Sequence, residues 1–334
     1  MKFLVIRFSS IGDIVLATPA IRCLRKQIIT SEVHFLTKPA FRMVTEANPY
    51  IDKFHYLSDD INALIRELKQ EEYDYVIDLH NNFRSIKIKR ALGVKSFTIR
   101  KLTFQKFLLT KLRINIMPGR HITTRSLDTV RSFGVEDDGL GLDYFIPEKD
   151  KVKERDIPAS HLAGYIAVVI GASYATKKMP VHKLRQLCSG IHHPIVLIGG
   201  KEDQEAGRQI AAIDKGKIYN ACGKFNLNES ADLVRRAKLV ISHDTGLQYI
   251  ASAFNKTVLA IWGSTSPELD VEPYYGKVRM AATAEPPYEN IRVPGLPCQP
   301  CSKYGNRRCP LGHFRCMENI NTDYIIERVE ARIR

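Results

Sequence analysis

The chain of 334 residues has no apolar run that approaches the length of a membrane span, and it has a single tryptophan. A membrane-spanning helix needs roughly 20 consecutive apolar residues, so no helical span is expected. The first ten residues, MKFLVIRFSS, turn polar too soon for a secretory signal peptide. Because 44% of the residues are apolar, the chain can still build sizeable cores. We therefore expect a cytoplasmic protein, long enough for two domains.

Acidic residues are scarce in residues 84–131, where Asp128 is the only one. The whole chain has 50 basic and 36 acidic residues, a formal charge of +14. Such an excess either serves solubility or attracts a polyanion such as nucleic acid, a phosphorylated substrate or an anionic membrane face. The basic residues of this segment predict a positive surface on the first domain: Arg84, Lys87, Lys89, Arg90, Lys95, Arg100, Lys101, Lys106, Lys111, Arg113, Arg120, Arg125 and Arg131.

Short apolar runs alternate with helical segments in the first half, which predicts a parallel α/β sheet. Pro19 lies inside the first helical pattern and should kink or split it. The predicted strands are 2–7, 32–37, 53–57, 74–79 and 96–100. The predicted helices are 13–28, 39–47, 60–71, 82–92, 103–112 and 123–133.

A second α/β series follows a linker at 136–160, which is rich in charge, Gly and Pro and carries one short predicted strand at 142–146. Its strands are predicted at 164–170, 194–199, 216–220, 238–242 and 257–262, and its helices at 180–189, 202–213, 227–237 and 245–254. Residues 284–320 are loop-rich, and 322–333 predict a closing helix. The expected domains are 1–155 and 156–320, with the closing helix in 321–334.

Each half contains a strand–helix turn suited to an anion. In KLVISHDTGLQYIASAF (238–254), an apolar strand runs through His243-Asp244-Thr245-Gly246 into a helix. The free N–H groups of a helix N-terminus, here from Thr245 to Leu247, bind phosphates readily. The segment KFLVIRFSSIGDIVLATPAI (2–21) has the same organisation. Ligands of open parallel sheets bind beyond the carboxyl ends of the strands, so two Rossmann-like domains should face each other across a ligand cleft.

Five segments carry a resemblance to a known family: FSSIGDIVLATPAI, GASYATKKMP, GGKED, SHDTGLQYIASAF and AIWGSTSPE. In this order they resemble the bacterial ADP-heptose:lipopolysaccharide heptosyltransferases, glycosyltransferase family 9. The resemblance implies a GT-B fold and inverting transfer of heptose from ADP-heptose to the anionic lipid A inner core at the cytoplasmic membrane face. It implies an acceptor-binding first domain, a nucleotide-sugar-binding second domain and no cofactor for catalysis. We expect a monomer that does not bind nucleic acid.

Asp13 matches the position of the family's catalytic base. Inverting transfer needs a carboxylate that takes the proton of the acceptor hydroxyl as the new bond forms. The alternative is that Asp13 only caps a helix, since Asp is a favourable residue at helix starts. On the acceptor side the resemblance places Ser10 and Gly12 beside it, and Gly12 allows close backbone approach.

The resemblance assigns the nucleotide-sugar to the second domain. Lys177 matches a lysine that neutralises charge on the leaving ADP in place of a metal, although Met179 stands where the family has Trp. Asp244 is expected to bind sugar or ribose hydroxyls, or to cap the helix. Glu202 would contact the ribose or only favour a helix start, and His243 would contact ligand or only pack. The remaining donor residues would be Gly171, Ser173, Thr245, Gly246 and Leu247.

Matches on the acceptor side are fewer. Arg84 and Ser85, in DLHNNFRS, and His121 and Arg125, in GRHITTRSLD, lie in segments that the resemblance assigns to the acceptor. Arginines suit bidentate contacts with phosphate or carboxylate. For the neighbouring lysines a solvated surface charge is the expected state: Lys87, Lys89, Lys101, Lys106 and Lys111.

Four cysteines cluster near the C-terminus: Cys298, Cys301, Cys309 and Cys316. Their number and the Cys-x-x-Cys spacing fit a closed structural zinc site, with His313 as a spare ligand. Reduced thiols are the alternative, and disulfides come last in a reducing compartment. Such a site has no open position and would not be catalytic.

Two other functions remain open at this point. A nucleotide-sugar 2-epimerase shares the architecture but needs no acceptor, and the GD turn at Asp13 and the KKMP segment speak against it. A nucleic-acid module would use the basic 84–131 segment, but no aromatic stacking or helix-turn-helix pattern accompanies it. The sugar, the acceptor position and the order of the reaction in core assembly are not determined by the sequence.

Overall fold

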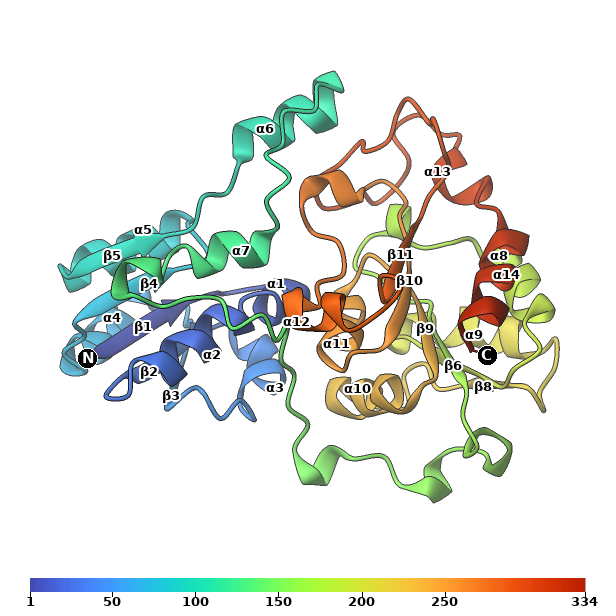
Figure 1. The fold of residues 1–334 in the computed structure, drawn as a ribbon, viewed down its shortest axis with the longest axis horizontal. Coiled ribbons are helices and arrows are strands. Elements are labelled where there is room, and N and C mark those ends of the chain that lie inside the picture. The colour runs from blue at the N-terminus through green and yellow to red at the C-terminus, as the bar shows by residue number, and fades with distance from the viewer. Residues whose placement is uncertain (334) are drawn as a thin grey trace.

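Residues 1–333 of the computed structural model form two parallel-sheet domains whose layers of helices enclose each sheet (Figure 1). The first sheet has the order β3-β2-β1-β4-β5, and all its neighbours are parallel. Its strands are β1 (Lys2–Ile6), β2 (Glu32–Thr37), β3 (Lys53–Tyr56), β4 (Tyr75–Asp78) and β5 (Lys95–Thr98). Each lies within one or two residues of a predicted strand. The inner strands β1, β2 and β4 are buried on both faces and so are nearly continuous apolar runs.

The second sheet has the order β11-β10-β9-β6-β7-β8 and is also parallel throughout. Its strands are β6 (Ile166–Val169), β7 (Ile195–Ile198), β8 (Ile218–Asn220), β9 (Leu239–His243), β10 (Thr257–Ile261) and β11 (Tyr288–Ile291). The predicted GT-B class of two Rossmann-like domains is confirmed. Strand β11 was not predicted, because its sequence YENI lacks an apolar run and becomes a strand only by pairing with β10.

The helices of the first domain follow the prediction with four differences. The helix predicted at 39–47 begins as a 3₁₀ turn over Pro39–Phe41, and the one predicted at 123–133 ends at Leu127, before a separate 3₁₀ turn over Arg131–Phe133. The predicted helix 13–28 is split ahead of Pro19, which occupies the first turn of the second piece, where its missing N–H costs nothing. The helix predicted at 103–112 changes to a wider π turn over Leu108–Leu112. The helices are α1 (Ile11–Val15), α2 (Thr18–Gln27), α3 (Arg42–Thr45), α4 (Ile61–Gln70), α5 (Phe83–Leu92), α6 (Thr103–Phe107) and α7 (Ile122–Leu127).

The second domain contains α8 (Val181–Gly190), α9 (Gln204–Ala211), α10 (Leu227–Arg236), α11 (Gly246–Ala253), α12 (Gly276–Ala281), α13 (Arg315–Glu318) and α14 (Thr322–Ile333). The closing helix α14 packs into the core of this domain, where Ile325 and Val329 join Leu184 and Leu187 of α8. The strand predicted at 142–146 is wrong: these residues form an irregular segment that runs beside the first domain. No helix within residues 1–333 is long and apolar enough to cross a membrane.

The two domains share an apolar contact at the carboxyl ends of their sheets. Tyr249 and Ile250 of α11 belong to the same buried cluster as Ile14 and Val15 of α1. In Figure 1, α1 and α11 lie side by side at the junction of the domains. The two predicted anion turns therefore meet at one place.

Candidate functional site

Two glycines allow the turns of the two domains to touch. A Cβ atom on Gly12 would lie 2.6 Å from the ring of Tyr249, and one on Gly246 would lie 2.5 Å from Cγ2 of Ile11. Both distances are shorter than van der Waals contact, so only glycine permits this approach. Gly12 and Gly246 thus set the distance between the two halves of the site.

Replacing Gly246 with alanine should separate the halves. Ile11 is branched at Cβ and cannot rotate away freely, so α1 and α11 must move apart. Overpacking of this kind costs about 1–3 kcal/mol of stability, and misplacing reacting groups by about 1 Å can lower a rate roughly 10²-fold. Turnover of the folded Gly246→Ala variant measures the effect. Gly216→Ala, which adds only a 3.4 Å contact in an exposed turn, is the matched control. Equal turnover of both variants would contradict this role of Gly246.

Asp13 is held in place by three hydrogen-bond donors. Its Oδ1 lies 2.6 Å from Nη2 of Arg7, and its Oδ2 accepts hydrogen bonds from the hydroxyl (2.7 Å) and backbone N–H (3.1 Å) of Ser10. Burial raises the pKa of the Asp13 carboxyl, but the Arg7 charge and the Ser10 hydrogen bonds outweigh it, so the pKa lies below its ordinary value. Asp13 is therefore a fixed carboxylate at neutral pH, able to accept a hydrogen bond from an incoming hydroxyl.

Cationic and polar groups other than Arg7 surround this carboxylate. Burial lowers the pKa of Lys106 to about 8, with the charge of Arg125 adding to the shift and that of Asp13 opposing it. Burial and the charge of Arg7 also lower the pKa of Lys101. The prediction of solvated side chains is therefore wrong for Lys101 and Lys106, which face the site from the segment between β5 and α7.

The other three lysines of this segment differ in their exposure and pairing. Lys87 and Lys111 are exposed, as predicted. Lys89 is not a solvated charge, because its Nζ lies 3.2 Å from the buried carboxylate of Asp78. The residue type alone does not show which lysine is paired and which is exposed, because the partner of Lys89 is Asp78 at the end of strand β4.

On the other side of the contact, Lys177 and Asp244 form an ion pair of 2.6 Å. The same Asp244 oxygen accepts a hydrogen bond of 2.8 Å from the Thr265 hydroxyl. Thr245, not Asp244, is the N-cap of α11, and no side chain caps the helix, so capping by Asp244 is excluded. The Lys177 charge offsets the carboxylate next to a helix end that is otherwise suited to an anion.

His243 has a packing role. It is 1% exposed, its Nε2 accepts a hydrogen bond of 3.0 Å from the backbone N–H of Met179, and burial lowers its pKa to about 4. A neutral imidazole thus links β9 to the loop that carries Lys177. Met179, where the family has Trp, is itself buried in the core of the second domain.

A second ion pair lies close by and was not predicted. Lys178 contacts the buried carboxylate of Asp203 at 2.6 Å, and a Cβ on Gly171 would lie 2.5 Å from the same carboxylate. Asp203 also accepts the Gly200 N–H at 2.9 Å. The neighbouring Glu202, which was the predicted site residue, is exposed. Which of two adjacent acids turns inward depends on the rotation of the following helix, and the sequence does not show it.

The predicted acceptor residues occupy different environments. Ser85 is buried, and its hydroxyl donates a hydrogen bond of 2.9 Å to Asp78 while capping α5. Arg84 beside it is exposed. Ser173, predicted on the donor side, is exposed as well. The contacts of Ser85 are those of a structural residue, whereas Arg84 is free to meet a ligand.

His121 links the two domains, whereas the hydrogen bonds of Arg125 lie within the first domain. His121 stacks on Tyr274 at 4.8 Å, and its Nε2 is 3.0 Å from the backbone oxygen of Glu272 in the second domain. Arg125 is 4% exposed and donates a hydrogen bond of 2.7 Å to the backbone oxygen of Arg100. Within residues 1–333 its Nη2 is buried without a hydrogen-bond partner.

The four clustered cysteines and His313 line one small cavity of about 20 Å³. Sγ of Cys298 lies 3.8 Å from Nε2 of His313. Burial raises the pKa of Cys316 to about 12, and the other three thiols add to the shift. All cysteines of residues 1–333 are free thiols. The structure therefore brings the four cysteines and His313 to one cavity, and the metal site stays a prediction.

The sequence and the fold of this chain are similar to those of known glycosyltransferases. Over 290 residues the chain is 25% identical to the lipopolysaccharide heptosyltransferase 1 of Campylobacter coli, covering 79% of this chain and 84% of the relative. The fold is similar to that of the family 9 glycosyltransferase from Veillonella parvula DSM 2008 (TM-score 0.76, 20% identity, 99% and 97% coverage). It is also similar to that of E. coli heptosyltransferase WaaC with ADP (TM-score 0.68, 19% identity, 99% and 100% coverage). Residues 61–305 match glycosyltransferase family 9 (heptosyltransferase). The chain therefore belongs to this family and is a glycosyltransferase of the GT-B fold.

Proposed function

We propose that the protein transfers heptose from ADP-heptose to an acceptor in the inner core of lipopolysaccharide, with inversion at the anomeric carbon. One observation carries the proposal: the Asp13 carboxylate and the uncapped N-terminus of α11 lie on opposite sides of a single contact between the domains. The names of the relatives supply the sugar, the nucleotide and the acceptor class.

In this mechanism the acceptor hydroxyl donates its proton to Asp13 while its oxygen bonds to the anomeric carbon. The bond between that carbon and the diphosphate oxygen breaks, and ADP leaves with the electron pair. The N–H groups of Thr245, Gly246 and Leu247 hold the diphosphate, and Lys177 moves from Asp244 towards the developing charge. Asp244 is then free to accept hydrogen bonds from sugar hydroxyls.

The residues on the acceptor side have separate tasks. Ser10 orients Asp13 through its hydroxyl. Arg84, Lys101 and Lys106 offer positive charge to an anionic acceptor, and the buried Arg125 adds to the positive field. Gly171 and Asp203 shape the donor pocket together with Lys178.

ADP release with defined acceptors tests the function. The purified protein should release ADP from ADP-heptose only when a lipid A–Kdo-type acceptor is present. Mass analysis of lipopolysaccharide from cells that lack the protein should show a truncation whose size identifies the sugar and the acceptor. ADP release without any acceptor, or full-length lipopolysaccharide in the deleted strain, would refute the proposal.

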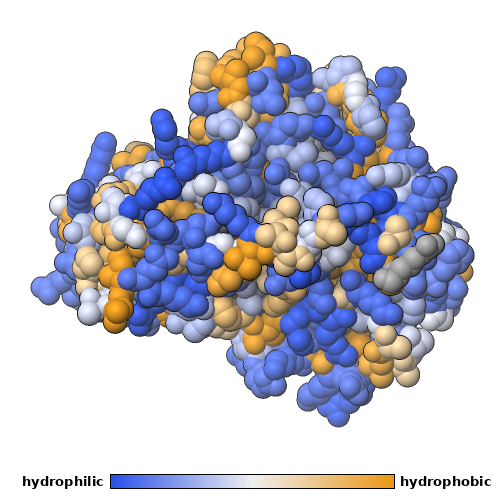
Figure 2. All heavy atoms as spheres, in the orientation of Figure 1, coloured by the Kyte–Doolittle hydropathy of each residue, from blue (hydrophilic) through white to orange (hydrophobic). Residues whose placement is uncertain are grey.

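We further propose that the segment around α6 places the protein on the cytoplasmic face of the inner membrane, where such an acceptor lies. Five large apolar side chains there are about half exposed or more: Phe104, Phe107, Leu112, Ile114 and Ile116. Figure 2 shows an apolar patch at the top of the molecule, above the position of α6 in Figure 1. Lys111 and Arg113 add positive charge beside these side chains, a combination typical of membrane-surface segments.

Removing two of these rings should weaken membrane binding. Burying a phenylalanine is worth about 1.5–3 kcal/mol, so Phe104→Ser with Phe107→Ser should lower partitioning onto vesicles that contain anionic lipid by at least ~10-fold. Co-sedimentation with the vesicles measures it. Ile29→Ser, which removes an apolar side chain that is 89% exposed elsewhere in the first domain, is the matched control. Equal sedimentation of the double variant and the control would rule out this surface.

We also propose that Cys298, Cys301, Cys309 and Cys316 bind a structural metal ion. Thiolates in this number suit zinc, and also iron. No three of these sulfur atoms within residues 1–333 lie within 4.8 Å of one another, so the side chains must turn inward to bind a single zinc ion. The cavity that they line gives room for that rotation.

Elemental analysis of the purified protein tests the metal. We expect about one metal ion bound by thiolates per chain, its removal by chelator to lower the melting temperature, and Cys309→Ser to lose it. Cys188→Ala, at a buried cysteine of α8 away from the cluster, should retain the metal. If X-ray absorption shows no metal–sulfur distance near 2.3 Å, the metal proposal is wrong and the four cysteines are reduced thiols.

A further inference from the structure

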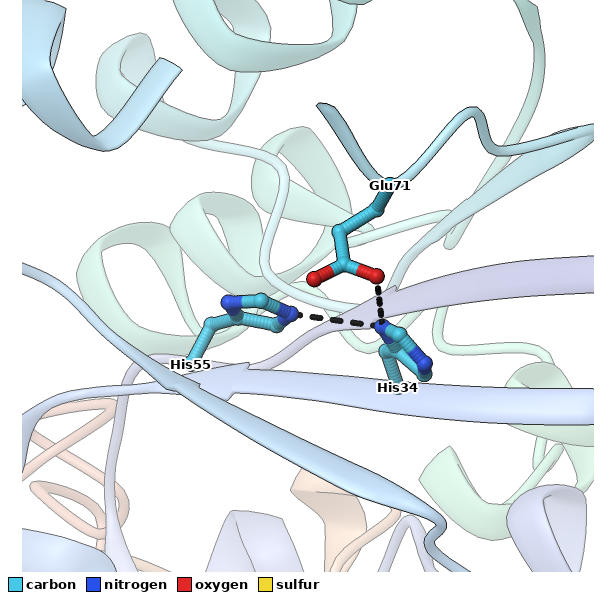
Figure 3. A group of neighbouring side chains, drawn as sticks. All are labelled: His34, His55 and Glu71. Atoms are coloured by element: carbon cyan, nitrogen blue, oxygen red, sulfur yellow. Dashed lines mark hydrogen bonds and ion pairs between the residues drawn. The ribbon is translucent and has the colours of Figure 1, made fainter. Parts of the chain in front are cut away.

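A second group of metal-binding side chains lies in the first domain, on the face of its sheet that α4 covers. His34 and Leu36 of β2 point to the same face, because residues two apart on a strand do so. Leu36 is paired with His55 of β3 in the parallel register, so His55 points to that face as well. The two histidines are 0% and 1% exposed. Glu71 and Tyr73 follow α4 directly and reach the same place. Figure 3 shows the Glu71 carboxylate pointing towards both imidazoles.

Carboxylates determine the tautomer of each imidazole. Nε2 of His34 lies 2.7 Å from a Glu32 oxygen, and Nδ1 of His55 lies 2.6 Å from a Glu67 oxygen. An ionised carboxylate can only accept, so each of these ring nitrogens carries the hydrogen. The inner nitrogens, Nδ1 of His34 and Nε2 of His55, then bear lone pairs.

These two inner nitrogens face each other at 3.3 Å. The Tyr73 hydroxyl lies 2.9 Å from one and 3.0 Å from the other, but its single hydrogen can serve only one of them. One buried acceptor is left without a donor, which is costly. A cation bound between the nitrogens would satisfy both at once.

The spacing of the atoms suits zinc. With metal–nitrogen distances of about 2.0–2.1 Å, tetrahedral ligands lie about 3.3 Å apart, and the two nitrogens already have this separation. Oε2 of Glu71 is 3.8 Å from Nδ1 of His34, so a small side-chain movement brings it into the same shell. Metal-binding histidines usually donate their outer N–H to a carboxylate, which fixes the orientation of the ring. Glu32 and Glu67 have this role for His34 and His55.

Charge also favours a cation here. Three carboxylates, of Glu32, Glu67 and Glu71, surround the neutral rings, against the two ammonium groups of Lys2 and Lys53. Lys2 and Lys53 both contact Glu71, and Lys53 is 54% exposed. The Lys53 side chain can therefore turn into solvent when a metal takes the Glu71 carboxylate.

We propose that His34, His55 and Glu71 bind a divalent transition-metal ion, zinc by its donor set, with the Tyr73 hydroxyl next to the fourth position. The site joins β2, β3 and the connection after α4. It lies towards the amino ends of the strands, where Lys2 pairs with Glu32, whereas Asp13 follows a carboxyl end. Its role is to stabilise the first domain, independently of sugar transfer.

Zinc binding to the metal-free protein tests the site, with a chromophoric chelator as competitor. The wild type should bind one equivalent more than His34→Gln or His55→Gln. Glu67→Gln keeps all three ligands but removes the carboxylate that supports His55, so the affinity at this site should fall ~10–100-fold. His193→Gln, at a partly exposed histidine that also contacts a glutamate, should behave as the wild type.

X-ray absorption of the zinc-loaded wild type separates this site from the cysteines and does not depend on the folding of any variant. Nitrogen and oxygen ligands give distances near 2.0–2.1 Å, and sulfur gives about 2.3 Å. A nitrogen–oxygen shell that Glu67→Gln weakens is the expected result. A spectrum with sulfur alone, or the same stoichiometry and affinity in all four variants, would overturn the proposal.

Discussion

Replacing Asp13 with asparagine should nearly abolish sugar transfer while leaving nucleotide-sugar binding intact. Asparagine keeps the size of the side chain but cannot take a proton. Its single amide oxygen can accept from Ser10 or from Arg7, whereas the carboxylate accepts from both. Loss of a general base lowers kcat by roughly 10²–10⁴-fold. Single-turnover transfer, together with calorimetric binding of ADP-heptose, separates the two effects.

A variant with a purely structural defect provides the control. Asp60 caps α4 through hydrogen bonds to the N–H groups of Asn62 and Ala63, on the far side of the first domain from α11. Asp60→Ala should lower stability by about 1 kcal/mol and leave kcat unchanged. If Asp13→Asn behaves like Asp60→Ala, with a lower melting temperature and normal turnover, then Asp13 serves only the helix.

The second large effect is expected from Lys177→Ala. Removing the ammonium group takes away charge stabilisation of the leaving diphosphate, and groups that stabilise developing charge contribute about 10²–10³-fold in kcat. It also leaves the Asp244 carboxylate, 10% exposed, without its cation beside a phosphate site. We expect kcat to fall more than the apparent affinity for ADP-heptose.

A double variant distinguishes these two contributions. If Lys177 acts only by neutralising Asp244, adding Asp244→Asn to Lys177→Ala should restore turnover. If Lys177 stabilises ADP as it leaves, the double variant should stay as slow as the single one, and the interaction energy of the cycle shows which holds. Lys183→Ala, at a lysine in the first turn of α8, is the control for the loss of one positive charge from the second domain.

Much of this site could be predicted from short segments. The strands that carry Asp13 and Asp244 are apolar runs, and parallel strands place the residues after their carboxyl ends at one edge of the sheet. Gly12 in the first turn indicated a close approach. The resemblance assigned one turn to the acceptor and the other to the donor, and the structure brings the two turns into contact through α1 and α11.

The ion pairs could not be predicted in this way. Lys177 with Asp244 and Lys178 with Asp203 each join residues of different elements. Adjacent residues of similar charge, such as Glu202 and Asp203, differ only in the direction that the backbone gives them. Lys106 had no distinguishing pattern, and its burial near the charges of Arg125 and Asp13 depends on how the segment around α6 packs.

By itself, the sequence determined the order of strands and helices, the two-domain class and the positions of the turns, because these follow from local periodicity and from glycine. The tertiary structure alone decided which charges are buried and paired. A buried charge is stable only when a partner from another element reaches it. That partner is chosen by how the two sheets and their helices pack together.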